Sequence, residues 1–441
     1  MSQIPVSLSK KAAVETGSPR LPNPRPPTAP AYFHVLAKPT GPICNLDCEY
    51  CFFLSKEALY PGDRFRMPDD LLEIYVSQLL ESHANSEEVT IAWQGGEPTL
   101  MGIDFFRRAI GLTEKYRQPR QQILHTIQTN GTLLTPEWCE MLATNKFLVG
   151  ISIDGPPDIH DRYRVDKRGN PSSDKVLRGL ALLKEHHVNF NILCTVNAAN
   201  QDHGVEVYRY FRDRLGAEFI QFIPIVERDN DTGYQEGDQV TSRSVGSDEW
   251  GRFMIEVFDE WLRHDVGKVY VSHFDAALAS WLGIAPAMCV FNDTCGNAVA
   301  MEHNGDLYSC DHFVEPDYLL GNIRETHLVE LVASPRQRAF GHAKRDSLPQ
   351  YCRECPFLFA CHGECPKNRF ALTPDGEPGL NYLCSGLKTF FGHIDGTMKL
   401  MAELLRTGRY ADQIGEVFAS VGRNDPCPCG STLKAKNCHQ R

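Results

Sequence analysis

Short apolar runs alternate with longer amphipathic segments from about residue 31 to residue 227. The apolar runs are rich in Val, Ile, Phe and Thr, as buried strands are, and they occupy residues 32–36, 89–93, 123–128, 148–153, 190–196 and 219–223. Between them, apolar side chains recur at helical spacing over residues 69–83, 105–116, 136–144, 174–186 and 205–215. Consecutive strand–helix units of this kind predict a parallel α/β sheet, either a partial barrel or a doubly wound sheet.

The loops that follow the predicted strands favour the barrel. In chain order they carry CNLDCEYC, QGGEP, TNG, DGPPD, Asn197 and residues 224–227. In a β/α barrel such loops leave the C-terminal ends of the strands and meet at one mouth. We therefore expect a partial (β/α)6 barrel over residues 31–247.

The rest of the chain divides by composition. Residues 1–30 are polar and proline-bearing, which predicts a disordered arm. Residues 228–247 are polar and glycine-bearing and resemble a linker. Residues 248–390 are dense in cysteine, with helices predicted at 247–263 and 272–282 and short strands at 298–302 and 307–310. Residues 391–421 are expected to be a helical connector, and residues 422–441 a small separate module.

Composition excludes several classes of function. The chain has 45 Lys and Arg against 56 Asp and Glu, a formal net charge of −11 that argues against a nucleic-acid partner. No apolar run is long enough for a membrane span, and the N-terminus lacks the apolar core of a signal peptide. We expect a cytoplasmic protein with no nucleic-acid and no membrane partner.

The 16 cysteines are mostly grouped, and in a reducing compartment grouped thiols indicate metal or iron–sulfur ligands. Cys44, Cys48 and Cys51 have the spacing C-x3-C-x2-C. Three thiolates can hold three irons of a [4Fe–4S] cluster and leave the fourth iron open, as a catalytic metal requires. The alternative is a zinc knuckle that lacks one ligand.

CNLDCEYC, with Tyr50 before its last cysteine, resembles the signature of radical SAM enzymes. The resemblance implies that the open iron binds S-adenosylmethionine (SAM), which is cleaved to a 5′-deoxyadenosyl radical. It also implies a set of SAM-binding residues in the loops: Tyr50, Gly95, Gly96, Glu97, Ser152, Asp154, Arg164 and Val226. Within this set, the Glu97 carboxylate suits the ammonium group of the methionine moiety.

A second field of eight cysteines lies between residues 289 and 384, and it suits two closed [4Fe–4S] clusters or two zinc ions. The field resembles the SPASM extension of radical SAM enzymes. That resemblance implies two ligand sets: Cys289, Cys295, Cys310 and Cys365 in one, and Cys352, Cys355, Cys361 and Cys384 in the other. Spacing alone would group Cys365 with its neighbours in the sequence.

Cys310-Asp311-His312-Phe313 resembles the anaerobic sulfatase-maturating enzymes. The resemblance implies oxidation of a serine or cysteine in an unfolded or nascent sulfatase to Cα-formylglycine, with Asp311 as the proton acceptor. It also implies an electron donor such as flavodoxin or ferredoxin. One departure is visible: Phe52 and Phe53 follow Cys51 where relatives often carry a tyrosine.

The C-terminal module has the pattern C-x-C-x8-C-H and resembles the SEC-C metal-binding motif. Its candidate ligands for one Zn²⁺ are Cys427, Cys429, Cys438 and His439.

Two other functions compete with sulfatase maturation. One is a radical SAM/SPASM maturase that forms a cross-link or thioether in a ribosomal peptide. The other is a non-catalytic iron–sulfur electron carrier. Asp311 argues against the first, and the three-cysteine site argues against the second.

Overall fold

The computed structural model describes residues 20–22 and 25–439, and it is built on one sheet of ten strands in the order β10-β9-β8-β1-β2-β3-β4-β5-β6-β7. The strands are β1 (His34–Lys38), β2 (Glu88–Trp93), β3 (Gln122–Thr129), β4 (Leu148–Ser152), β5 (Asn189–Val196), β6 (Phe219–Pro224), β7 (Tyr270–Val271), β8 (Ala298–Glu302), β9 (Asp306–Tyr308) and β10 (Leu319–Asn322). Neighbours from β1 to β7 pair in parallel. The predicted partial barrel is confirmed, because β1 to β6 coincide with the six predicted strands.

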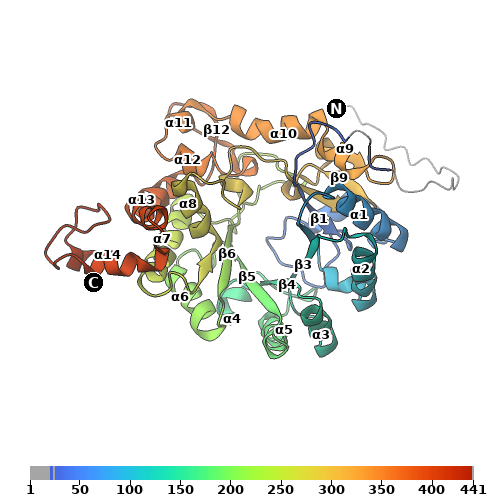
Figure 1. Cartoon of the computed structure of the whole chain (residues 1–441), viewed down its shortest axis with the longest axis horizontal. Coiled ribbons are helices and arrows are strands. Elements are labelled where there is room, and N and C mark those ends of the chain that lie inside the picture. The colour runs from blue at the N-terminus through green and yellow to red at the C-terminus, as the bar shows by residue number, and fades with distance from the viewer. Residues whose placement is uncertain (1–19, 23–24, 440–441) are drawn as a thin grey trace.

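Several α-helices cover the outside of this sheet (Figure 1), and the α-helices of the described chain range from four to 23 residues in length. They are α1 (Asp69–Ser82), α2 (Ile103–Tyr116), α3 (Pro136–Thr144), α4 (Pro157–His160), α5 (Ser173–Glu185), α6 (Gly204–Arg209), α7 (Ser247–His264), α8 (Ser272–Leu282), α9 (Leu328–Val332), α10 (Pro335–Asp346), α11 (Gln350–Arg353), α12 (Leu358–Cys361), α13 (Cys384–Arg406) and α14 (Ile414–Ala419). In Figure 1, α1, α2, α3, α5 and α6 lie outside the arc of strands. Buried Trp93 of β2 shows how they pack, since its ring lies 5.8 Å from that of Tyr75 and 5.7 Å from that of Phe106.

The sheet does not end at the predicted barrel boundary. The short strand β7 extends one edge, and β8, β9 and β10 of the cysteine-dense region extend the other. Strand β8 pairs in parallel with β1, with Lys38 opposite Glu302, and β9 then turns back antiparallel to β8. The cysteine-dense region is therefore continuous with the barrel, and the chain that follows β9 is placed beside the end of β1.

The polar stretch predicted as a linker forms a structured loop. Arg228 and Val240 form a β-bridge, Lys56 donates a hydrogen bond to the Gly233 carbonyl (3.0 Å), and the Gln235 amide donates one to Glu315 (2.9 Å). These contacts hold the segment to Lys56, which follows the three-cysteine loop, and to Glu315, which follows β9.

The predicted helical connector likewise belongs to the core. Helix α13 begins at Cys384, and Phe390, Ile394 and Met398 on it are fully buried. It crosses α7 so closely that a Cβ on Gly251 would lie 2.5 Å from the Gly386 carbonyl oxygen. These contacts make α13 a structural element of the molecule.

Most of the arm predicted over residues 1–30 lies outside the described residues. Its described end is packed: Leu21 and Ala29 contact the core, and the Thr28 hydroxyl donates to the Ala333 carbonyl (3.2 Å). At this end, apolar and hydroxyl side chains find partners in the core and near α9. Within the described part of the chain, every helix is too short or too polar to cross a bilayer.

Candidate functional site

The three-cysteine loop follows β1 and is anchored by backbone pairing. The Asp47 amide donates to the Val165 carbonyl (2.8 Å), and the Glu49 amide donates to the Tyr163 carbonyl (3.0 Å). Burial raises the pKa of Cys44 to about 12 and that of Cys48 to about 11. Buried thiols of this kind become good ligands only when a metal supplies the positive charge that their thiolate forms need.

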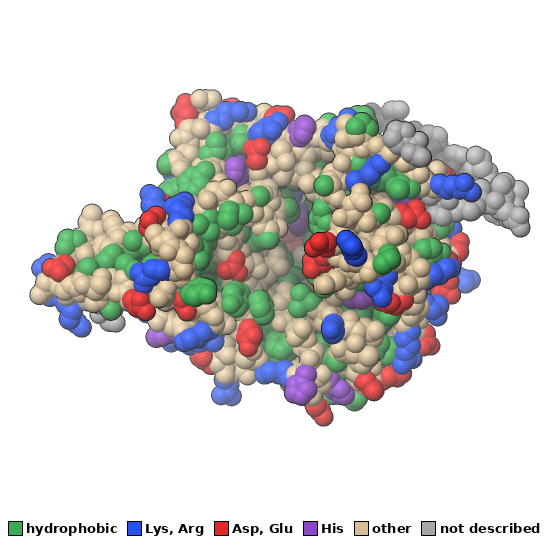
Figure 2. Space-filling model, viewed as in Figure 1, with side chains coloured by type: hydrophobic (Ala, Val, Ile, Leu, Met, Phe, Trp, Pro, Cys, Tyr) green, Lys and Arg blue, Asp and Glu red, His purple; other side chains and the backbone are tan. Residues whose placement is uncertain are grey.

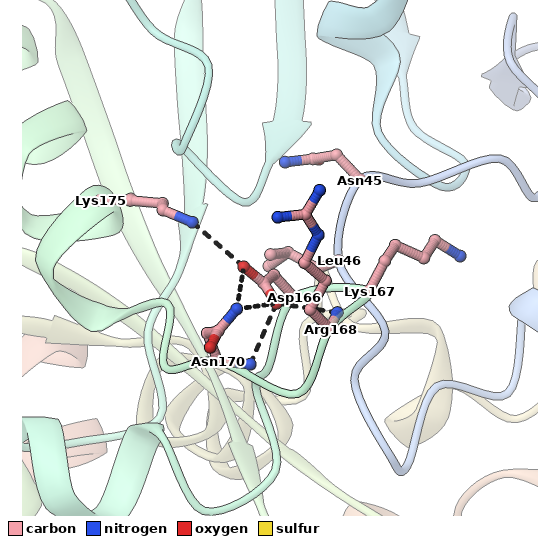
Figure 3. A pocket seen from close by; sticks show the side chains of 7 residues that line it. All are labelled: Asn45, Leu46, Asp166, Lys167, Arg168, Asn170 and Lys175. Carbon is pink, nitrogen blue, oxygen red and sulfur yellow. Dashed lines mark hydrogen bonds and ion pairs between the residues drawn. The ribbon is translucent and has the colours of Figure 1, made fainter.

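A tight turn lies behind this loop, where Leu46 forms a β-bridge with Asp166 (Figure 3). The Asp166 carboxylate accepts hydrogen bonds from the Arg168 and Asn170 amides (2.9 and 3.0 Å) and pairs with Lys175 (3.3 Å). An open cavity of about 400 Å³ is lined by this turn and by Asn45 and Leu46 of the cysteine loop. None of the predicted ligands lines this cavity. We therefore infer that the turn serves to hold the three-cysteine loop in place through Leu46.

Tyr50, Asp154 and Arg164 form one buried polar cluster next to Cys48. The Tyr50 hydroxyl donates to Asp154, and Arg164 Nε donates to the same carboxylate oxygen (2.9 Å). Burial by itself would raise the pKa of Asp154, but the Arg164 guanidinium holds it below its ordinary value. The charge of Arg164 also favours the thiolate of Cys48. Three predicted residues, from the connections after β1 and after β4, therefore meet at the cysteine site.

The glycines of the QGGEP loop allow two loops to approach each other. Gly95 has φ +115°, and a Cβ on Gly96 would lie 2.2 Å from the Ile43 carbonyl oxygen. The Gly96 amide donates to the Gly41 carbonyl (2.8 Å), which ties this loop to the one that leads into Cys44. Only glycine permits this backbone contact.

Glu97 is held by several protein hydrogen bonds in the loop after β2. Its side chain is fully buried and accepts hydrogen bonds from the Thr99 amide (3.0 Å), the Thr99 hydroxyl (2.6 Å), the Thr129 hydroxyl (2.8 Å) and the Asn130 amide (2.8 Å). With four protein donors and no solvent contact, the Glu97 carboxylate links the loop after β2 to the loop after β3 by hydrogen bonds.

Ser152 and Val226 lie at two further strand ends. Ser152 is the last residue of β4, and its hydroxyl accepts a hydrogen bond from Gln128 (2.9 Å). Val226 is buried just beyond β6. Both lie at the carboxyl ends of their parallel strands, the same end of the sheet at which the three-cysteine loop follows β1.

Asp311 lies at this mouth, although it comes from the far end of the sequence. It follows Cys310 directly and forms an ion pair with Lys38, the last residue of β1. Burial alone would raise the pKa of Asp311, but Lys38 and then His312 hold it below its ordinary value. Asp311 is therefore a carboxylate that stays charged in a largely buried position.

Phe52 and Phe53 connect the three-cysteine loop to Asp311. The Phe52 ring lies 5.5 Å from that of His312, and Lys38 Nζ lies 3.8 Å from the centroid of the Phe53 ring. The two phenylalanines form an apolar wall between the Cys51 loop and the carboxylate. Burial lowers the pKa of His312 to about 4, so this imidazole is neutral near pH 7.

The eight cysteines of the second field act on one another in two sets. Burial and then the Cys365 thiol raise the pKa of Cys310, and Cys289 adds to the effect; Cys289 also acts on Cys295 and Cys365. The other set is coupled in the same way through the following residues: Cys352, Cys355, Cys361 and Cys384. By these interactions Cys365 lies near Cys289 and Cys310, which are distant from it in the sequence.

The C-terminal module brings four ligand atoms together. In the described part of the chain, it is the group whose Cys, His or carboxylate atoms all lie within 4.8 Å of one another, and its members are Cys427, Cys429, Cys438 and His439. The module is tied to the core at one close contact, since a Cβ on Gly396 of α13 would lie 1.5 Å from the Cys429 carbonyl oxygen. The ring of Phe418 on α14 stacks on His439 at 4.1 Å.

Comparison with known proteins agrees with this arrangement. Family profiles match the Radical SAM superfamily over residues 39–211, the SPASM iron–sulfur cluster-binding domain over residues 293–356 and the SEC-C motif over residues 423–441. A serine-type anaerobic sulfatase-maturating enzyme of Bacteroides thetaiotaomicron is 46% identical over 384 residues, or 84% of this chain and 92% of the relative. This chain belongs to the anaerobic sulfatase-maturating enzymes. A cysteine-type member of Clostridium perfringens is 33% identical over 360 residues, or 81% of this chain and 95% of that relative.

A solved structure supports the same family at the level of the fold. The structure described as native anSMEcpe with bound AdoMet has a TM-score of 0.76 and 32% identity, and the match covers 84% of this chain and 99% of that one. The same protein with AdoMet and a peptide named Cp18Cys has a TM-score of 0.75 and 31% identity.

In this member of the sulfatase-maturating family, Lys38 is a residue at the mouth that the sequence analysis missed. It ends an otherwise mostly apolar strand and directly precedes Pro39. A cation at the C-terminal end of a barrel strand is a signal for a functional residue. Its partner, however, lies 273 positions away and could not be recognised by spacing.

Proposed function

We propose that this chain is an anaerobic sulfatase-maturating enzyme that oxidises a serine or cysteine of a sulfatase polypeptide to Cα-formylglycine. The observation that carries the proposal is the Asp311–Lys38 ion pair at the mouth of the barrel, on the loop after Cys310 and beside the three-cysteine loop. A base adjacent to both cysteine sites suits an oxidation in which a carbon radical loses one electron and the proton of its hydroxyl or thiol group.

The donor sets fit the cofactors of the family. We assign a SAM-binding [4Fe–4S] cluster to Cys44, Cys48 and Cys51, and two further [4Fe–4S] clusters to the two four-cysteine sets. Their support is the presence of three buried thiols on one loop and of two groups of mutually coupled thiols. We assign one Zn²⁺ to the C-terminal module, because three thiols and an imidazole are a usual tetrahedral donor set.

The SAM contacts that we assign are Tyr50, Gly95, Gly96, Ser152, Asp154, Arg164 and Val226. Arg164 is already oriented by Asp154, and Asp154 by the Thr195 amide (3.0 Å), so the guanidinium needs little reorganisation to meet a carboxylate. Glu97 acts through the loops that it holds together.

SAM, when bound with its cluster, supplies a 5′-deoxyadenosyl radical that removes a hydrogen atom from the substrate Cβ. The carbon must then lose one electron and its hydroxyl or thiol proton to become an aldehyde or thioaldehyde. Asp311 is charged and lies at the mouth, so it can accept that proton. Lys38 keeps the carboxylate charged between turnovers, and the wall of Phe52 and Phe53 limits the access of water from the side of the cysteine loop.

The substrate is a peptide segment in extended form, which can enter the hollow at the centre of the molecule (Figure 2). A flavodoxin- or ferredoxin-type donor supplies the electron that starts each turnover.

The test is an anaerobic reaction with SAM, a reductant and a peptide that bears a Ser-x-Pro-x-Arg or Cys-x-Pro-x-Arg motif. We expect formation of 5′-deoxyadenosine together with a peptide mass that corresponds to formylglycine. The matched control is the same peptide with Ala at the target position, which must keep its mass. Release of 5′-deoxyadenosine with an unchanged mass for both the Ser and the Cys peptide would contradict the proposal.

A further inference from the structure

Lys344 is a buried cation whose hydrogen-bond partners are uncharged. Its side chain lies in α10 and is 1% exposed, and its Nζ donates to the Cys289 and Val290 carbonyl oxygens, both at 2.8 Å. In the described part of the chain, no carboxylate lies within ion-pair distance of this ammonium group. Burial of an ammonium group without an anion is costly, so a negative charge other than a side-chain carboxylate is expected next to Lys344.

Lys367 is a second lysine next to the same cysteine set, two residues after Cys365. Its charge acts on Cys365 and Cys310, and its Nζ is 3.5 Å from the Val226 carbonyl oxygen. Glu364 is the carboxylate that acts on both lysines, yet its Oε2 accepts hydrogen bonds from Asn368 and Asn381 (2.9 and 2.7 Å). The two lysines therefore lack a paired counter-ion among the described side chains.

We propose that Lys344 and Lys367 raise the reduction potential of the cluster held by Cys289, Cys295, Cys310 and Cys365, which makes it the acceptor of the substrate electron. A [4Fe–4S] cluster with four thiolates is anionic in both redox states and gains one more negative charge on reduction. Nearby positive charge stabilises the reduced state more than the oxidised one, and net charge is a main determinant of such potentials. The inference rests on the proposed function only for the origin of the electron.

The step balances at this site. The Cβ radical of the substrate becomes an aldehyde or thioaldehyde by losing one electron and one proton. The Asp311 carboxylate accepts the proton. The cluster assigned to Cys310, the residue directly before Asp311, accepts the electron and is reduced by one electron. The thioaldehyde, where cysteine is the target, is then hydrolysed to the aldehyde and sulfide.

The test is a redox titration of the anaerobic holoenzyme, followed by EPR, in the absence of peptide. The background carries Cys44, Cys48 and Cys51 as Ala, so that only the two four-cysteine clusters contribute. We expect Lys344→Met and Lys367→Met each to move one cluster to a more negative potential, and the double variant to move it further. Lys344→Arg keeps the charge and should keep a potential near that of the parent.

Lys388→Met is the matched control, because exposed Lys388 acts on Cys355 and Cys384 of the other set. It should leave the cluster that responds to Lys344 unchanged. The inference is overturned if iron-replete Lys344→Met and Lys367→Met keep both parental potentials, or if Lys344→Arg shifts as far as Lys344→Met. If one lysine variant loses iron, the reduction potential of the other variant tests the inference. Failure of the proposed function would appear separately, as wild-type enzyme that makes no formylglycine.

Discussion

Replacement of Lys38 by Met tests the role of the ion pair with Asp311. The two side chains are 3% and 19% exposed, so the pair is largely shielded from solvent. Removal of one partner of a buried ion pair costs about 3–5 kcal/mol, and the partial exposure of Asp311 favours the lower end of that range. About 3 kcal/mol corresponds to roughly a 100-fold shift of the protonation equilibrium of Asp311 toward its neutral form.

The sign of the pH dependence follows from this shift. In the wild type, Lys38 holds the pKa of Asp311 below its ordinary value against the effect of burial, so the base is charged throughout the neutral range. In Lys38→Met the carboxylate protonates as the pH falls, and a protonated carboxyl cannot accept the substrate proton. We expect formylglycine formation to fall progressively as the pH drops below neutral and to recover toward alkaline pH, as a general base requires.

The assay measures 5′-deoxyadenosine and peptide mass in one reaction at several pH values. Iron content and SAM cleavage should stay near wild type, which separates loss of the base from loss of the cluster. Lys115→Met is a matched control, because Lys115 also pairs with a carboxylate, Glu73 (2.6 Å), but is 58% exposed. A wild-type pH profile for iron-replete Lys38→Met would refute the reasoning.

Three further changes test separate parts of the site. Asp311→Asn keeps the shape of the side chain and removes its basicity, so formylglycine formation should fall about 10²–10⁴-fold while SAM cleavage persists; a wild-type rate by mass spectrometry would exclude Asp311 as the base. Replacement of Cys44, Cys48 and Cys51 together by Ala should remove about a third of about twelve irons in reconstituted protein and abolish SAM cleavage. Zinc in place of iron in the remaining clusters would contradict the SPASM assignment. Removal of residues 422–441 should release one zinc, measured by metal analysis, and leave the iron content intact, because the module lies outside the sheet.

The local properties of this protein were readable from the sequence. Strands β1 to β6 were predicted within a few residues, because buried parallel strands and amphipathic helices leave periods of side chains that depend only on near neighbours. The three cysteines of the first site were likewise predicted as ligands from their type and spacing. Cysteines of the first site follow one another within eight residues, so their grouping needs no long-range information.

The chemistry of the mouth was decided by tertiary structure. Asp311 reaches Lys38 because β8 pairs with β1 across more than 250 residues of sequence, and no local period encodes that pairing. The same long-range packing places Cys365 with Cys289 and Cys310, and it buries Glu97 under four hydrogen-bond donors. Spacing determines which side chains are available as ligands and bases. Their electrostatic partners depend on which strand ends meet, and that is a property of the folded sheet.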